Sequence, residues 1–338
     1  MAEALKWLIA LGMACLFTAP ITTVAAEEQQ LEAVVVSGLQ PGPGLWQVRK
    51  GDHVLWVLGT LEPLPRDIEW ETDEAALVIG QSQQVLLSPV GKLSADVGFF
   101  GGLALLPTAL GARKNPDKRT LSELMPAELH ARWELLKRQY LGRGRGIEKK
   151  RPLLAANKLY SRAIARNGMT LEPLVDKQVQ KLAKRARVAI TRPTLAIRLD
   201  DTRSALKEVA ATDLDDLRCF EETLDRLEQD LDTMRDRANA WAVGDIEALA
   251  ELPFVDQRQS CANAILSAAA IRERGLEDLP ERMGEVWLEA AEAALAVNRS
   301  TFAVLPLRQL LATDGYLSTL QARGYEVVAP ALSPPSGS

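Results

Sequence analysis

The sequence predicts an α+β fold, in which a mixed central sheet is built from an N-terminal hairpin and C-terminal strands, with a large helical lobe inserted between them. Three observations predict it. Apolar runs at residues 45–48 and 54–58 flank a Gly-Asp turn, the short-range signature of a β-hairpin. Further short apolar runs occupy residues 300–328, whereas residues 121–272 are dominated by helical periodicity. Because the strands at both ends need a shared core, we expect them in one sheet.

The two ends of the chain predict segments outside this fold. Residues 1–26 predict an export signal, because Lys6 gives a weak positive charge and an apolar core and a small-residue cleavage site follow it. The apolar core is shorter than a membrane span of about 20 residues, although retention as an uncleaved anchor stays open. Residues 27–44 predict a flexible leader and residues 331–338 a disordered tail. We therefore expect a periplasmic or secreted protein with one domain at 45–330 and no membrane span after cleavage.

Composition limits the size of the apolar core and the kinds of partner that the protein can bind. The 338 residues carry a net charge of −5 and are 47% apolar, enough for one large core or two smaller ones. Residues 137–192 hold 16 basic and 3 acidic residues, an excess that is either balanced by acidic helices after residue 200 or forms a platform for anionic envelope polymers, lipids or acidic peptides. Residues 142–146 (Gly-Arg-Gly-Arg-Gly) follow a helical segment and predict a flexible basic loop rather than a phosphate loop. Nucleic acid is not expected outside the cytoplasm, and the segment lacks interleaved aromatics.

Local patterns predict the remaining elements. The second hairpin strand ends at Gly59-Thr60, because two prolines follow and a central strand cannot continue through residues without an N–H donor. A helix is expected at residues 73–79, where two acidic residues favour the first turn, and a strand at 85–87. Residues 97–111 predict a buried or partly buried apolar segment rather than a membrane contact. Further elements are expected as helices that begin near residues 121, 126, 152 and 174, a helix at 279–296, a strand at 300–305, a helix at 315–323 and a strand at 325–328.

Residues 213–243 carry the longest regular pattern. Apolar residues recur in two rows with a spacing of seven, and the second row lies three places after the first. The pattern predicts one helix with a single apolar seam, which either packs inside the molecule or binds a partner helix. The rows are Leu217, Leu224, Leu231 and Ala238, and Phe220, Leu227, Met234 and Trp241.

Removal of the export signal leaves two cysteines, Cys219 and Cys261. In an oxidising compartment such a pair favours one disulfide, and closing a loop of this length is expected to stabilise the fold by about 4 kcal/mol. Cys219 lies just off the apolar seam, where a bridge to the following helix is within reach. A pair of buried, unlinked thiols stays open as the alternative, because sequence does not fix the geometry of a bridge.

Short motifs stand in a specific order along the chain. The hairpin ends in Gly59-Thr60-Leu61-Glu62 and is followed by Leu-Pro and by Trp70. Later motifs are an Arg-Pro helix start at 151–152, Val-Asp at 175–176, Trp-x-x-Gly-Asp at 241–245 and Gly-Tyr-x-Val at 324–327. Over about residues 45–330, these motifs resemble the TraB/GumN family, whose relatives include the Tiki metalloproteases.

The resemblance implies a site built from two Gly-x-x-His motifs and an acidic residue at strand ends. Glu62 stands where the first motif has histidine, and Ser88 stands where the family has glutamate after the next strand. The second motif falls on residues 306–309, where Pro306 replaces glycine and Gln309 replaces histidine. Apart from Pro306, the apolar, glycine and tryptophan residues around these positions agree with the family pattern, whereas the polar residues at the ligand positions do not.

The surviving side chains make a poor metal site. A catalytic divalent metal needs about three His, Asp, Glu or Cys ligands and an open position for water. Only Glu62 is a strong ligand here, because neutral Ser88 and Gln309 oxygens bind zinc poorly. We therefore predict no confident catalytic residue and no cofactor, with a divalent metal only if the modified site is active. His53 and His130 are expected to be ordinary exposed side chains.

The same positions predict one cleft. Loops at the ends of strands in open α/β sheets gather at one edge, so Glu62, Ser88 and Gln309 should converge in one pocket. A buried carboxylate without a cation is costly, so a basic residue is expected near Glu62, with Arg308 the first candidate.

Three functions follow from these patterns. Replacement of the expected ligands favours an exported pseudoenzyme that serves as a binding or accessory protein of the cell envelope, with a peptide, protein or anionic envelope polymer as ligand. The alternatives are a metal-dependent hydrolase or peptidase with a modified site around Glu62, and an interaction scaffold that uses residues 213–243. No nucleophile elbow, phosphate loop or dinucleotide fingerprint follows a strand.

Overall fold

The structure is a computed structural model that describes residues 38–95, 105–108, 110–199, 204, 216–253, 261–262, 272–273 and 275–330. All of these belong to one compact unit. The export signal, the C-terminal tail and much of the apolar segment at 97–111 lie outside the described residues. Within them, every helix is too short or too polar to cross a membrane.

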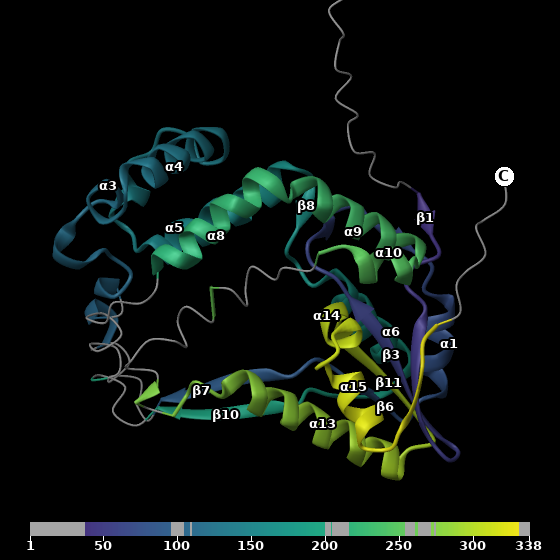
Figure 1. The fold of residues 1–338 in the computed structure, drawn as a ribbon. Helices are drawn as coiled ribbons and strands as arrows, with labels where there is room; N and C mark the ends of the chain where they lie inside the picture. Colours follow the sequence, from purple (N-terminus) through teal and green to yellow (C-terminus); the bar gives the residue numbers. More distant parts are fainter. Residues whose placement is uncertain are drawn as a thin grey trace, which may run out of the picture. The chain divides into compact units, whose positions relative to one another are not determined.

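A six-stranded mixed sheet forms the centre of the fold (Figure 1). The prediction that the N-terminal hairpin and the C-terminal strands share one sheet is confirmed. In spatial order the strands are β12 (Glu326–Val328), β2 (Leu45–Lys50), β3 (His53–Thr60), β11 (Ser300–Pro306), β6 (Gln84–Leu86) and β9 (Ala189–Thr191). The first three pair antiparallel, and the last four run parallel. Residues 301–305 of β11 are all buried, as expected for a central parallel strand that is covered on both faces.

Helices from both halves of the chain cover this sheet and complete its core. Trp287 and Trp241 are fully buried in that core, together with most of β3 and β11. The helices that contribute to it are α1 (Asp73–Gln81), α6 (Leu174–Ala186), α9 (Leu231–Val243), α10 (Ile246–Glu251), α13 (Leu279–Val297), α14 (Leu307–Leu311) and α15 (Tyr316–Ala322).

A second core lies among helices in the middle of the chain. Trp133 and Phe220 are fully buried there, with their ring centroids 5.1 Å apart. The chain thus fills two apolar cores rather than one. The elements around the second core are α3 (Leu121–Leu124), α4 (Ala127–Tyr140), the 3-10 helix η2 (Gly146–Lys149), α5 (Pro152–Arg166) and α8 (Asp216–Gln229). Another 3-10 helix, η1 (Pro116–Lys118), precedes α3.

The helical segment is less uniform than its pattern predicts. The large helical lobe lies between the two ends of the chain as expected, but two elements within residues 121–272 belong to the sheet layer. Strand β9 forms an edge of the main sheet, and α6 packs in the sheet core rather than in the helical core. Short strands also form three small sheets, namely β4 (Leu64–Pro65) with β8 (Met169–Thr170), β7 (Val90–Ala95) with β10 (Thr194–Leu199), and β1 (Leu39–Gln40) with β5 (Glu69–Trp70).

The expected helix at residues 213–243 is two helices. Residues 213–215 lie outside the described part, and α8 ends at Gln229 before α9 begins at Leu231. The seam is buried inside the protein: Phe220, Leu224, Leu227 and Met234 lie in the helical core, and Ala238 and Trp241 lie in the sheet core. This burial removes the seam as a docking surface for a partner helix.

Two further predictions have clear outcomes. Cys219 and Cys261 form a disulfide with Cα atoms 4.8 Å apart, so the expected bridge is confirmed. The flexible leader expected at 27–44 differs from the structure at its end, where β1 pairs with β5 and Gly42 donates its N–H to the Ala242 carbonyl at 2.8 Å.

Candidate functional site

The carboxyl ends of four parallel strands meet at one edge of the sheet. In the register of β3 and β11, Leu305 lies opposite Gly59 and Pro306 lies opposite Thr60. The two motif positions therefore leave the sheet side by side, since both chains turn away directly after this pair. Strands β6 and β9 end at the same edge on the far side of β11.

Packing explains why the first motif keeps its glycine. A Cβ on Gly59 would lie 2.8 Å from a Leu307 methyl group and 3.0 Å from one of Leu310, so α14 approaches the end of β3 too closely for a side chain. The Gly59 carbonyl accepts a hydrogen bond of 2.9 Å from the indole N–H of buried Trp241. Trp241 also meets Trp70 edge to face, with the ring centroids 5.9 Å apart. These contacts of Gly59 and Trp241 thus fix the position of the chain at the end of β3.

The predicted site residues occupy this edge from three elements. Glu62 follows β3 by two residues, and its Oε2 atom is buried. Ser88 follows β6, where its hydroxyl donates to the Val304 carbonyl of β11 at 3.1 Å. Gln309 is half-buried in α14, directly after β11. The convergence of these three side chains in one pocket remains a prediction, although the topology places their strand ends together.

Arg308 has a neighbour other than the expected one. Burial raises the pKa of the Tyr316 hydroxyl, and the nearby positive charge of Arg308 partly opposes that rise. Tyr316 stacks on Trp287 with ring centroids 5.3 Å apart. Arg308 therefore lies near the start of α15, and its pairing with Glu62 stays a prediction.

Asp176, which the sequence analysis names only as part of the Val-Asp motif, and Arg192 are further site candidates. Asp176 lies in the first turn of α6 with only 12% of its side chain exposed, and Arg192 follows β9. The two side chains are 3.8 Å apart, and Arg192 also donates to the Ser88 carbonyl at 3.4 Å. Burial raises the pKa of Asp176, and the Arg192 charge only partly offsets this. A buried carboxylate with a raised pKa at a strand-end edge is a candidate binding group.

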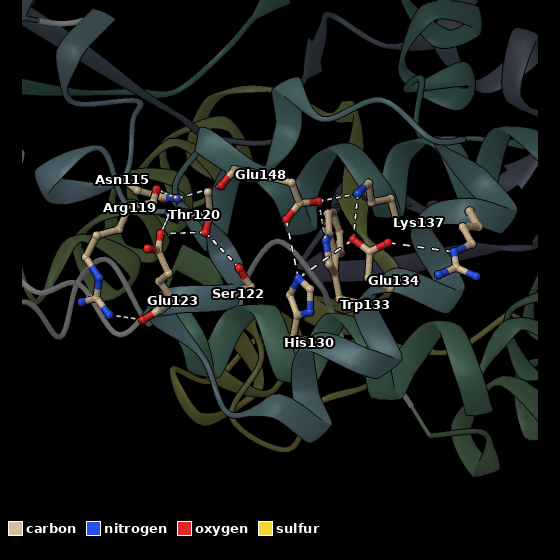
Figure 2. A network of polar contacts seen from close by, with 11 residues as sticks. Asn115, Arg119, Thr120, Ser122, Glu123, His130, Trp133, Glu134, Lys137 and Glu148 are labelled. Atoms are coloured by element: carbon tan, nitrogen blue, oxygen red, sulfur yellow. Dashed lines mark hydrogen bonds and ion pairs between the residues drawn. The ribbon is translucent and has the colours of Figure 1, made fainter.

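A separate polar network joins α4 and η2 beside the helical core, and Figure 2 shows it. Glu148 of η2 accepts hydrogen bonds at Oε1 from Lys137 Nζ (2.6 Å) and Trp133 Nε1 (3.0 Å). Lys137 also bonds Glu134 at 2.8 Å. His130 Nε2 lies 3.8 Å from Glu148 Oε2 and 3.9 Å from Glu134 Oε1. The expectation that His130 is an ordinary exposed residue is wrong, because α4 and η2 enclose it between two carboxylates.

The residue types of this network are those of a metal site, but the positive charge around them is not. Ligand atoms of His130, Glu134 and Glu148 lie within 4.8 Å of one another. Both carboxylates already bind the Lys137 ammonium; burial lowers the pKa of this group, but the hydrogen bonds and negative charges of Glu134 and Glu148 together raise it above its usual value. The surrounding pocket of about 410 Å³ is lined by five basic and two acidic residues. The net positive charge disfavours a divalent cation, so we interpret the network as a partly buried ion-pair cluster that fastens η2 to α4.

Comparison with protein families matches residues 44–329 of the chain to the TraB/PrgY/gumN family. The chain belongs to this family. Neither a curated protein nor a solved structure matches it. The resemblance to the family is thus confirmed over nearly the whole domain of this TraB/PrgY/gumN protein.

The metal that the family motifs imply does not fit the side chains at this edge. The Ser88 hydroxyl is engaged as a donor to Val304, and Gln309 offers a neutral amide. Glu62 is the one anionic group among the three motif positions. One carboxylate with two neutral oxygens does not hold zinc tightly, so the side chains at these three positions do not fit the metal that the family motifs imply.

Proposed function

We propose that this TraB/PrgY/gumN protein is an exported, catalytically inactive binding or accessory protein of the cell envelope. The observation that carries the proposal is the contrast at the strand-end edge. The scaffold of the family motifs is retained in Gly59 and Trp241, whereas the ligand positions hold Glu62, Ser88 and Gln309. Because the scaffold residues are present and strong metal ligands are not, a binding function is favoured over metal-dependent catalysis.

The strand-end edge supplies groups that suit a polar ligand. Arg192 gives a positive charge between Ser88 and Asp176, and burial raises the pKa of the Asp176 carboxyl. We infer that the ligand is a peptide or another molecule with both donor and acceptor groups.

A modified metal-dependent hydrolase centred on Glu62 is the second candidate. The buried Oε2 atom of Glu62 and the raised pKa of Asp176 favour it, since perturbed carboxylates gather at catalytic sites. The hydrolase would act on peptide or envelope substrates.

Metal analysis of the purified mature protein separates the two candidates. The binding-protein proposal predicts a substoichiometric content of zinc, manganese and other divalent ions, equal in the native protein and in Glu62→Ala. About one metal ion per chain that disappears on Glu62→Ala would refute it. Glu69→Ala, an exposed carboxylate on β5, is the matched control for loss of a negative charge.

A further inference from the structure

Most of the basic residues at 137–192 form no ion pair within the part of the chain that the structure describes. Eleven of the 16 make no ion pair with the residues that the structure describes. The sequence offers acidic helices after residue 200 as a partner for this charge. Among described residues, one ion pair joins the segment to them, between Arg151 and Asp216 at 2.6 Å. The excess charge is therefore available for a ligand. The five that form ion pairs are Lys137, Arg138, Arg151, Lys177 and Arg192.

The Gly-Arg-Gly-Arg-Gly loop at 142–146 concentrates this charge between two pockets. Gly142 lies two residues after α4, has a left-handed φ of 82° and donates its N–H to the Lys137 carbonyl at 2.8 Å. From there the residues alternate. Arg143 and Arg145 line the pocket of about 410 Å³ beside α4, whereas Gly144 and Gly146 line a second pocket of about 440 Å³ beside α5.

Each pocket presents cations from its own helix. Arg138 of α4 and Lys149 of η2 line the first pocket with the two loop arginines. Lys158, Arg162 and Arg166 of α5 line the second. The exposed guanidinium groups of Arg143 and Arg145 make no hydrogen bond to the described part of the protein, so their donors remain available for oxyanions.

We propose that this loop and its two flanking pockets bind a linear polyanion, a chain that carries phosphate, sulfate or carboxylate groups at short intervals. A chain that crosses the loop can place one anionic group in each pocket, and the second contact is then strengthened by the high effective concentration of the tethered group. Concave pockets with charged linings favour such a chain over a flat lipid surface. The proposal does not rest on the strand-end site, whose residues belong to other elements.

Binding of labelled soluble polymers to the mature protein tests the proposal. The probes are inorganic polyphosphate and a sulfated polysaccharide, each measured by fluorescence anisotropy at fixed ionic strength. Arg143→Gln/Arg145→Gln and Lys158→Gln/Arg162→Gln should each weaken binding by about tenfold, since each removes two exposed charge contacts. The matched control is Lys181→Gln/Lys184→Gln, which removes the same charge from another basic pocket on α6 and should leave binding nearly unchanged.

Different outcomes identify the polymer or overturn the proposal. Preference for polyphosphate or for the sulfated polysaccharide assigns the anionic group. The proposal fails if the α6 control weakens binding as much as the loop variants, because that result indicates general attraction to charge. It also fails if free inorganic phosphate at equal phosphate concentration competes as well as the polymer, or if vesicles of anionic phospholipid bind more tightly than any soluble chain. Thermal unfolding of each variant checks that it remains folded.

Discussion

At the scale of a single residue, burial of the charged Asp176 carboxylate lowers the stability of the fold. Because burial raises its pKa in the folded protein, the fold binds a proton more readily than the unfolded chain does. Its contribution to stability is therefore most favourable below its ordinary pKa of 3.8 and falls as pH rises through the folded pKa.

Asp176→Asn tests this cost. The variant should have a higher free energy of unfolding than the native protein at pH 7, and the difference should vanish near pH 3, where both states of Asp176 are protonated. Urea denaturation at several pH values measures it. A variant that is less stable at pH 7 would show that attraction by Arg192 outweighs burial.

Comparing substitutions at two buried tryptophans measures the contribution of the Trp241–Gly59 hydrogen bond to stability. Trp241→Phe leaves the buried Gly59 carbonyl without its donor, which costs about 1–3 kcal/mol beyond the loss of ring volume. Trp287→Phe is the matched control, because Trp287 is also fully buried but its indole N–H makes no hydrogen bond within the described residues. Chemical denaturation should show the larger loss for Trp241→Phe, and equal losses would contradict a structural role for this bond.

At the scale of elements, a disulfide ties α8 to the segment that contains Cys261, next to Leu153 of α5. Cys219→Ala/Cys261→Ala should lower the free energy of unfolding by about 4 kcal/mol, since the unfolded chain regains the freedom of a loop closed over a sequence separation of 42. Denaturation of the native protein with and without reductant should reproduce the difference. An unchanged midpoint in both comparisons would rule out this contribution.

A buried ion pair joins α5 to α8. Arg151 and Asp216 are only 9% and 8% exposed, and Arg151 Nε lies 2.6 Å from Asp216 Oδ2. Asp216→Ala should cost about 3–5 kcal/mol because it leaves a buried guanidinium without this carboxylate, whereas Arg151→Met/Asp216→Leu should cost less than the two single changes together. A double-mutant cycle measured by urea denaturation decides the point, and additive losses would argue against coupling.

Elements differ in how far the sequence predicts them. Strands β2, β3 and β11 follow from short apolar runs with turn signals, and these were predicted almost to the residue. Strands β9 and β10 were missed because residues 188–199 lie in a basic, mostly helical stretch, although Pro193 marks the break between them. The seven-residue pattern also continues across Asp230, where the chain leaves one helix and begins the next, so periodicity alone did not reveal two helices.

At the scale of the whole molecule, topology was more predictable than chemistry. The adjacency of the loops after Gly59 and Pro306 follows from placing both strands in one sheet. The roles of Asp176 and Arg192 did not follow, because the burial of one and its contact with the other arise from packing of α6 against the sheet. His130 was misjudged for the same reason, since η2 closes over it from a later part of the chain.

We propose that the strand-end edge keeps the scaffold of the family motifs without their metal ligands, and restoring those ligands tests this proposal most directly. Glu62→His/Ser88→Glu/Gln309→His places two imidazoles and a carboxylate at the motif positions. Calorimetric titration with zinc should show one site per chain with an affinity at least about a hundredfold above that of the native protein. Native protein that binds zinc at this edge as tightly as the restored variant would contradict the account.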